Sequence, residues 1–417
     1  MNTLSSLSNT VKNYWLNLSN TFYGILIVLL ISSISDACSK KNSNPGGTPQ
    51  QPGNTNTAAE LDTVKTVYVS GGRSNQFYAL DASTGKVKWS VPLGGIAKFS
   101  PAYAGGKVFV GASDQKLYAF DTSGKVSWSV SMADPFRSAP LAESGLVYVS
   151  TSSSVLAIDA QTGQTRWQFS DGGTSHLIYN NNTLFFNAED NSLHALDALS
   201  GKEKWHYDSA FSGSIPIVSG NQLYFIQGDK TMLVLNATTG TTITATKAVF
   251  PYSTYNFAIA HNVKYGGIYF LEYNQYGGSD GVACADSANL NNLNFHTSFF
   301  SIFQGPGIMP ILEDSLIVMP FAVLNAKTGA NLEVNMLSGS NVTGISYLNG
   351  TVYCLTGQKD FYDPYSGGYQ YADIMAVDVH KNQIVWRTPI KNADFYGVEP
   401  CIVSRSGTAH TGALSFK

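Results

Sequence analysis

Short runs of alternating apolar and polar residues, separated by clusters of Gly, Ser, Asn and Asp, fill most of the chain after residue 64. Typical runs are Val67–Val69 and Val108–Val110, and each is followed by a turn cluster and a second run, Phe77–Leu80 or Leu117–Phe120. Alternation with a period of two between turn signals predicts β-strands joined in hairpins. The chain is therefore expected to be all-β.

One motif, Ala-x-Asp-x-x-Thr-Gly-x-x-x-Trp, returns about every 39 residues, a spacing typical of repeat architectures. Asp accepts amide hydrogens from the next residues of a turn, and Gly adopts a positive φ at no steric cost. The cleanest copies start at Ala79 and Ala157, and partial copies start at Ala119, Ala195 and Ala376. Their Trp residues are expected to pack between neighbouring repeats rather than to bind a ligand: Trp89, Trp128, Trp167, Trp205 and Trp386.

Counting the turns gives the architecture. Eight are found, at Asp81, Asp121, Asp159, Asp197, Asn236, Asp286, Asn325 and Asp378. Most units are preceded by a further strand with Pro at its start, which suits a strand with a free edge. The first unit lacks this strand, and an orphan strand follows at 398–403. We predict an eight-bladed β-propeller of four-stranded antiparallel blades over 61–417, its ring closed by the C-terminal strand. The strand layout between Leu316 and Asn325 is left open.

The N-terminal segment has a different composition. Residues 22–34 are apolar, too short for a membrane span and suited to the core of a signal peptide. Ser35-Asp36-Ala37-Cys38 follows and resembles a bacterial lipobox. We predict a signal peptide over 1–37, and a lipidated Cys38 with a flexible linker over 38–60, where Asn, Pro, Gly, Thr and Gln dominate. The alternative is an ordinary signal peptide or an uncleaved anchor with an incidental cysteine.

Charge and reactive side chains narrow the functions. Nucleic acid is not expected, because the net charge is −3, only 13% of residues are charged and no basic run occurs. The sequence contains no HExxH, GxSxG or P-loop motif, and its seven His residues show no metal-ligand spacing. Cys284, Cys354 and Cys401 suit buried apolar positions, with a Cys354–Cys401 bridge as the alternative because the last and first blades adjoin.

The pattern Tyr-Ala-Leu-Asp-x-x-Thr-Gly-Lys-x-x-Trp is matched fully or in part at 78–89, 118–128, 156–167 and 194–205. These segments resemble the PQQ-like repeats of quinoprotein propellers. Together with Cys38 and the chain length, they make the chain similar to the lipoproteins of the outer-membrane barrel-assembly machinery, the BamB type. The resemblance implies a monomeric, non-enzymatic scaffold without a cofactor. It would be anchored by lipid in the outer membrane, facing the periplasm or the cell surface, and would bind envelope proteins or components of the assembly machinery.

The same resemblance leaves a quinone-dependent dehydrogenase of alcohols or sugars as an alternative. Such enzymes hold pyrroloquinoline quinone (PQQ) with calcium in the central channel, often beside a vicinal cysteine pair. This chain has no adjacent cysteines, and Glu399 and Asp394 are the only carboxylates that the pattern places near a channel mouth. Calcium usually takes about six to eight oxygen ligands, so two carboxylates would form a poor site.

The later units carry longer loops rich in Tyr, Phe, Gly and Asn. Long loops on a rigid scaffold often carry binding sites, and Tyr offers rigid area with a polar tip. The candidate partner-binding residues are Tyr252, Tyr255, Tyr273, Tyr276, Phe361, Tyr362, Tyr365, Tyr369, Tyr371, Phe395 and Tyr396. The alternatives are that these rings pack on one another or plug the channel, or that a glycan stacks on them. A calcium ion among Asp360, Asp363 and Asp373 is conceivable from loop spacing alone.

Overall fold

The chain divides into two compact units, Met1–Ala59 and Glu60–Lys417. All residues that the computed structural model describes belong to the second unit. They are 64–173, 176–208, 216–227, 231–247, 257–262, 267–272, 280–286, 289–299, 311–313, 315–319, 322–332, 341–357, 362–363, 368–369, 371–391, 393, 395, 398–404 and 409–411. Every regular element in these ranges is a β-strand. A search of the same ranges finds no helix with the length and apolarity needed to cross a membrane.

The regular repeats form four sheets. The strands are β1 (Val64–Ser70), β2 (Gln76–Asp81), β3 (Val87–Pro92), β4 (Ala102–Ala104), β5 (Lys107–Gly111), β6 (Lys116–Asp121), β7 (Val126–Ser131), β8 (Leu141–Glu143), β9 (Leu146–Ser150), β10 (Val155–Asp159), β11 (Thr165–Phe169), β12 (Ile178–Asn180), β13 (Thr183–Asn187), β14 (Leu193–Asp197), β15 (Glu203–Tyr207), β33 (Cys401–Ser404) and β34 (Ala409–Thr411). Sheet 1 has the order β3-β2-β1-β33-β34, and sheets 2, 3 and 4 hold β4 to β7, β8 to β11 and β12 to β15 in chain order.

The later repeats form four more sheets and a hairpin. The strands are β16 (Ile217–Ser219), β17 (Gln222–Ile226), β18 (Thr231–Asn236), β19 (Thr242–Lys247), β20 (Phe257–Asn262), β21 (Gly267–Glu272), β22 (Asp280–Asp286), β23 (Asn289–Phe299), β24 (Ile311–Glu313), β25 (Leu316–Val318), β26 (Val323–Asn325), β27 (Asn341–Leu348), β28 (Thr351–Gly357), β29 (Tyr362–Asp363), β30 (Gly368–Tyr369), β31 (Tyr371–Asp378) and β32 (Gln383–Lys391). Sheet 5 holds β16 to β19, sheet 6 holds β20 to β23, sheet 7 has three described strands, β24 to β26, and sheet 8 has the order β27-β28-β31-β32.

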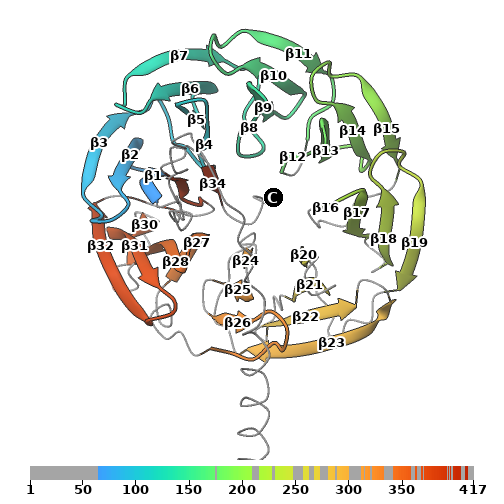
Figure 1. Cartoon of the computed structure of the whole chain (residues 1–417). Helices are drawn as coiled ribbons and strands as arrows, with labels where there is room; N and C mark the ends of the chain where they lie inside the picture. The colour runs from blue at the N-terminus through green and yellow to red at the C-terminus, as the bar shows by residue number, and fades with distance from the viewer. Residues whose placement is uncertain are drawn as a thin grey trace, which may run out of the picture. The chain divides into compact units, whose positions relative to one another are not determined.

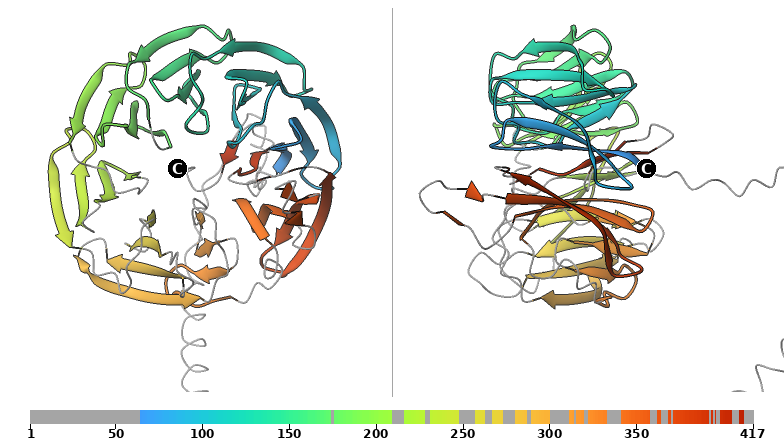
Figure 2. Two further views of the ribbon diagram at one scale, coloured as in Figure 1. Left: turned by 180° about the vertical axis from the view of Figure 1, so that it is seen from behind. Right: turned by 90° about the vertical axis from the view of Figure 1, so that its left-hand side faces the viewer.

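The sheets stand side by side around a common centre (Figures 1 and 2). In sheets 2 to 4 the first strand along the chain (β4, β8 or β12) lies toward the centre, and the last (β7, β11 or β15) lies at the rim. In sheet 1 the rim strand is β3. β4 contacts β8, and this series of contacts continues through β12, β16, β20 and β24 to β27. The prediction of an all-β chain built from four-stranded antiparallel sheets is confirmed.

The C-terminal strand β33 pairs antiparallel with β1, with Tyr68 opposite Cys401 and Val67 opposite Ile402. A further strand that the sequence pattern did not predict, β34, then pairs with β33 on its other side. It contacts both β27 and β4. The three-residue run from Ala409 to Thr411 is too short for alternation to reveal a strand. Sheet 1 therefore combines the first and last described strands of the chain.

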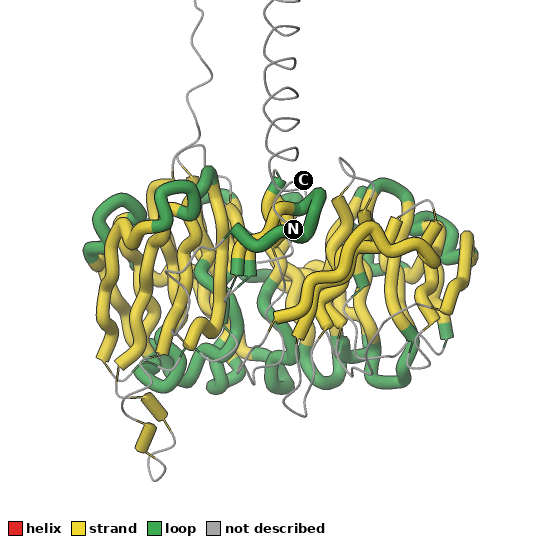
Figure 3. Tube along the Cα trace, turned by 90° about the horizontal axis from the view of Figure 1, so that it is seen from below, coloured by secondary structure: helices red, strands yellow, loops and turns green. Residues whose placement is uncertain are grey.

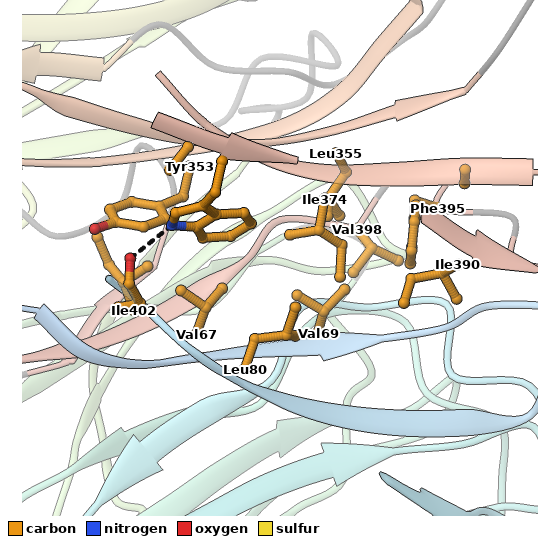
Figure 4. Close-up of a cluster of buried hydrophobic side chains, with 14 of the residues drawn as sticks. Val67, Val69, Leu80, Tyr353, Leu355, Ile374, Ile390, Phe395, Val398 and Ile402 are labelled. Carbon is orange, nitrogen blue, oxygen red and sulfur yellow. Dashed lines mark hydrogen bonds between the residues drawn. The ribbon is translucent and has the colours of Figure 1, made fainter. Parts of the chain in front are cut away.

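The hydrophobic core lies between sheets. Each cluster of buried apolar side chains draws on two neighbouring sheets, as where Val67 and Leu80 of sheet 1 meet Leu355 and Ile374 of sheet 8 (Figure 4). Both faces of the second strand of a sheet are buried, as in β9, where all five residues from Leu146 to Ser150 are buried. The hairpin β29–β30 forms its own small sheet between β28 and β31 and projects beyond the other strands (Figure 3).

Candidate functional site

The repeat motif places a small residue opposite a large one. Ala79 lies directly across the strand pair from Trp89, and Ala157 lies across from Trp167. Both Ala residues are fully buried. A register shift follows at once in each pair, between Ala79 and Leu80 in the first. A bulge of this kind bends the strand and re-aims a side chain, so the indole can reach past its own sheet.

The Asp of the motif builds the turn. Asp81 Oδ1 accepts the amide hydrogens of Ser83 at 3.1 Å and Thr84 at 3.0 Å, and Gly85 follows with φ +70°. These hydrogen bonds, the one from the Ser83 hydroxyl first, lower the pKa of Asp81 to about 2. Hydrogen bonds also lower the pKa values of Asp121, Asp159, Asp197 and Asp378. Asn236 and Asn325 accept amide hydrogens in the same way in their turns.

Each motif Trp reaches the turn of the next sheet. Its indole Nε1–H donates to a backbone carbonyl there: Trp89 to Thr122 at 2.9 Å, Trp128 to Ala160 at 3.2 Å, Trp167 to Ala198 at 2.9 Å, Trp205 to Ala237 at 3.1 Å and Trp386 to Ala82 at 2.8 Å. The last bond joins residues 304 positions apart and is the dashed line of Figure 4. The Trp ring also covers the turn Gly. A Cβ added to Gly201, for example, would stand 2.5 Å from the Trp167 ring.

Sheet 6 makes the same connection with different residues. Phe295 replaces Trp and faces Gly329 of sheet 7, but a phenyl ring has no N–H to donate. The fully buried Tyr269 donates its hydroxyl hydrogen to the Ala326 carbonyl at 2.7 Å. Thr297 donates to the Gly329 carbonyl at 2.8 Å. Tyr269 and Phe295 thus provide what one indole provides elsewhere, whereas the Thr297 bond has a counterpart beside Trp386, where Thr388 donates to the Gly85 carbonyl at 2.7 Å.

Two junctions lack the aromatic residue. In sheet 5 the Trp position is taken by Thr244, which lies opposite Val234 and is exposed. The following turn, after Asp286, has no Gly in its sequence. In the turn of sheet 8 the Gly is replaced by Asn382, with φ +51°. Among the described residues, sheets 5 and 7 bring no aromatic ring to the turn of the next sheet. Those turns, in sheets 6 and 8, are the two that lack the Gly.

Of the candidate partner-binding aromatics, the structure describes the side chain of Phe395. That side chain is only 2% exposed and packs in the core cluster between sheets 8 and 1 with Val69 and Ile390 (Figure 4). Phe395 therefore follows the self-packing alternative and is not available to a partner. For Tyr362, Tyr369 and Tyr371 only the strand backbone is described, and the rest lie outside the described residues: Tyr252, Tyr255, Tyr273, Tyr276, Phe361, Tyr365 and Tyr396.

Asp373, a candidate calcium ligand, has another role. Its carboxylate is 4% exposed and accepts hydrogen bonds from Arg387 Nε at 2.8 Å and from the same guanidinium's Nη2. Both hydrogen bonds reach Oδ2, so the charge of Asp373 is paired with that of Arg387. Asp360 and the side chain of Asp363 lie outside the described residues.

The carboxyl group of Glu399 lies at the entry to the inner strand β33, where the backbone N–H of the same residue donates to Ser100 Oγ at 2.8 Å. Burial raises the pKa of Glu399 from 4.5 to about 8, so the group is largely protonated at neutral pH. A neutral carboxyl is a poor ligand for calcium, which prefers ionised oxygens. Asp394 lies outside the described residues. Glu399 therefore does not fit as a ligand of a calcium-bound quinone.

The cysteines of the later sheets are free thiols. Cys354 packs in the core between sheets 7 and 8, and Cys401 packs in the core between sheets 1 and 2. The two belong to different clusters and are not bridged. Burial raises the pKa of Cys354 to about 12, which suits an inert core residue. The buried-hydrophobe interpretation is correct for Cys284, Cys354 and Cys401, and Cys38 lies outside the described residues.

The structure also groups three side chains that the sequence left apart. Ligand atoms of Asp171, Asp190 and His194 lie within 4.8 Å of one another. They come from an inter-sheet connection, a hairpin and a strand, so no local spacing links them.

Comparison with known proteins gives a family for the regular repeats. The sequence profile of the family described as outer membrane protein assembly factor BamB matches residues 54–174 and 152–245. No curated protein matches the chain in sequence. Among solved structures, BamB from Moraxella catarrhalis is similar at 15% identity and a TM-score of 0.50, over 84% of this chain and 99% of that one.

Two dehydrogenases share the fold. Dihydro-heme d1 dehydrogenase NirN, in complex with DHE, is 12% identical with a TM-score of 0.60, over 80% of this chain and 75% of that one. The quinohemoprotein alcohol dehydrogenase of Comamonas testosteroni is 17% identical with a TM-score of 0.51, over 71% of each chain. At such identities the likeness shows the fold alone. The chain thus has a β-propeller type of fold and, over residues 54–245, repeats similar to those of the BamB type.

Proposed function

We propose that this chain is a non-enzymatic, lipid-anchored scaffold of the cell envelope that binds protein partners, in the manner of an outer-membrane assembly factor. The observation that carries the proposal is the family match across the regular repeats, supported by a structural likeness that spans 99% of the Moraxella BamB chain. Fold alone does not choose between scaffold and dehydrogenase. The protonated Glu399 and the Arg-bound Asp373 favour the scaffold.

The scaffold is an eight-bladed propeller whose ring is closed in blade 1. Sheets 1 to 8 are then the blades, in chain order. Three contacts support closure: β33 pairs with β1, Trp386 of the last blade binds Ala82 of the first, and β34 contacts β27 and β4 on either side. Repetition round a ring leaves only short sheet edges, which suits a rigid platform for partners.

Cys38 carries the lipid, the following residues up to 60 form the tether, and the anchor lies in the outer membrane. Replacing Cys38→Ser tests this. The wild-type chain should stay with the membrane fraction and incorporate a labelled fatty acid, whereas the variant should lose the label. A variant that keeps the label, or a wild type that never acquires it, would contradict the anchor.

The partner-binding surface lies on the loops of blades 6 to 8. The β29–β30 hairpin projects from this region as a separate two-stranded sheet, so a partner can reach it (Figure 3). The segment 361–371, which includes this hairpin, holds Phe361, Tyr362, Tyr365, Tyr369 and Tyr371. Aromatic residues of this kind supply large contact area at low entropic cost.

Cross-linking in intact cells, followed by purification through a C-terminal tag and mass spectrometry, tests the function. Recovery of envelope proteins or barrel-assembly components from wild type is expected. It should be lost when 361–370 is replaced by a short Gly-Ser turn. Leu199→Ser is the matched control, because Leu199 is 57% exposed in blade 4, far along the chain from the hairpin.

The result also separates the alternatives. Retention of all partners by the hairpin variant would move the binding surface elsewhere. Recovery of no partner, together with binding of pyrroloquinoline quinone and calcium and reduction of an electron acceptor by an alcohol, would replace the scaffold with the dehydrogenase. Retention on a polysaccharide column without protein partners would support glycan binding.

A further inference from the structure

One corner of sheet 4 gathers side chains whose acceptor atoms outnumber the hydrogens available to them. Asp171 lies in the connection from β11 to β12, Asp190 in the hairpin between β13 and β14, and His194 on β14. Backbone contacts hold the connection against the hairpin: Gly173 forms a bridge with Ala188, and Glu189 N–H donates to the Gly172 carbonyl at 3.3 Å. The three side chains are therefore placed by a rigid frame.

His194 is 7% exposed, and Glu203 orients its imidazole ring through Nδ1. Its Nδ1 lies 2.7 Å from Glu203 Oε1, an acceptor, so in the neutral ring the hydrogen sits on Nδ1. Nε2 is then the lone-pair nitrogen. It lies 3.5 Å from Asp171 Oδ2 and 2.6 Å from Ser192 Oγ. A carboxylate behind the ring and a lone pair in front are the usual arrangement of a metal-binding histidine.

At the front of the ring one side-chain hydrogen faces two acceptors, and the Ser192 backbone N–H also donates to Asp190 Oδ1 at 2.8 Å. The Ser192 hydroxyl has one hydrogen, yet its oxygen lies 2.5 Å from Asp190 Oδ1 and 2.6 Å from His194 Nε2, both acceptors. The neighbouring cation, Arg137, pairs with a different carboxylate, Glu189, at 3.0 Å. A positive charge between the three ligand atoms would satisfy them together.

The equivalent corners of sheets 2 and 3 lack this excess. In sheet 2 the carboxylate of Asp114 is matched by the hydroxyl of Tyr118 at 2.5 Å, and Gly95 stands at the position of Asp171. In sheet 3 the single carboxylate of Asp134 is matched by the hydroxyl of Ser153, and Leu156 stands at the position of His194. In both corners one carboxylate is paired with one hydroxyl donor. Sheet 4 departs from this pairing at two positions.

We propose that Asp171, Asp190 and His194 Nε2 form a binding site for a divalent transition-metal ion of the zinc class. One imidazole nitrogen and two carboxylate oxygens are ligands that zinc accepts, with water completing a tetrahedral set. Glu203 orients the imidazole from behind and is a positioning residue. Asp190 is exposed and Asp171 half-buried, so the ion can enter from solvent.

Isothermal titration of the full-length, EDTA-treated protein in detergent with zinc chloride tests the proposal. One equivalent of zinc should bind to wild type. Asp190→Asn, a change at an exposed side chain, should weaken binding at least tenfold. His194→Leu, which copies the residue of sheet 3, should abolish it. Asp208→Asn is the control, since Asp208 is highly exposed on the same sheet and outside the three ligands, and it should bind as wild type does.

Glu203→Gln separates orientation from ligation. It keeps the three ligands but weakens the hold on the ring, so it should bind zinc more weakly than wild type and more tightly than His194→Leu. The absence of zinc binding by wild type at millimolar metal would overturn the site. So would binding that Asp190→Asn and His194→Leu leave unchanged, because the ion would then sit elsewhere.

Discussion

Sheets 1 to 5 meet through one contact repeated four times, whereas sheets 5 to 8 meet through a different arrangement at each junction. In the first region an indole binds a carbonyl and covers a Gly of the next turn. In the second, the exposed Thr244 takes the Trp position, Tyr269 and Phe295 together supply the donor and the ring, and Asn382 replaces the Gly. The family profile matches the first region only, up to residue 245.

The difference separates the geometry of a junction from the residues that make it. Three elements recur where the contact exists: a donor to the turn carbonyl, a ring on the turn Gly and a small residue opposite the ring. At the junction of sheets 6 and 7 the small residue is Cys284, opposite Phe295. Phe295 supplies the ring on the turn Gly, and Tyr269 supplies the donor to the turn carbonyl. The contact persists after its sequence signature is lost.

The largest expected effect is at the junction where the two regions rejoin. Trp386→Ala removes the ring between sheet 8 and sheet 1 and its bond to Ala82. We expect a loss of about 3–5 kcal/mol in the free energy of unfolding, as for other large-to-small core changes. Urea titration measures it. Trp386→Phe keeps most of the ring and should cost far less, so equal losses for the two variants would contradict the packing role.

The turn Gly should be nearly as sensitive in the regular region. Gly201→Ala forces a non-Gly residue to φ +70° and brings its Cβ to within 2.5 Å of the Trp167 ring. We expect a loss of about 2–3 kcal/mol from strain and overlap together. Gly106→Ala is the control, because φ is +79° but nothing lies within 4 Å of the added Cβ. Only the strain, about 1–2 kcal/mol, should remain there.

Two carboxyl groups, those of Asp81 and Glu399, should respond to pH in opposite directions. The pKa of Asp81 is lowered to about 2, so its contribution to stability is present above about pH 4 and is lost as pH falls toward 2. The pKa of Glu399 is raised from 4.5 to about 8, so stability is lost as pH rises between those values. Glu399→Gln should therefore stabilise the protein at pH 9 by roughly 2 kcal/mol and leave it unchanged at pH 4. Thermal melts across pH check this, and a constant difference between the two proteins would refute it.

The smallest effect concerns the substitute donor. Tyr269→Phe removes the hydroxyl that binds the Ala326 carbonyl in a buried junction, at an expected cost of about 1–2 kcal/mol. Adding Phe295→Trp to this variant should recover part of the loss, because the indole N–H then has the carbonyl to itself. In the wild-type background the same Phe295→Trp should not stabilise. A double-mutant cycle measures the coupling, and additive effects would show that Tyr269 does not stand in for the indole.

Sequence alone predicted the strands, the turns at Asp81 and its equivalents, and an interior position for the Trp residues, because each follows from local periodicity and turn chemistry. It missed what depends on two distant segments. Phe395 follows an exposed-looking polar run, yet its ring lies in the core between sheets 8 and 1. Tyr269 reads as an ordinary strand residue, and its bond to Ala326 spans 57 positions. Asp171 and His194 become neighbours only through the pairing of Gly173 with Ala188.

The pairing of β1 with β33 also sets the order of events during folding. Strand β1 has one neighbour, β2, in its own segment of chain and gains the other only when residues 401–404 arrive. A chain made or exported from its N-terminus therefore carries an unsatisfied strand edge on β1 until residues 401–404 have been made. Closing so long a loop is slow compared with forming the local hairpins. We expect the regular sheets 2 to 5 to form early and sheet 1 to be completed late, which leaves its open edge as the place where the unfinished chain is most prone to mispair.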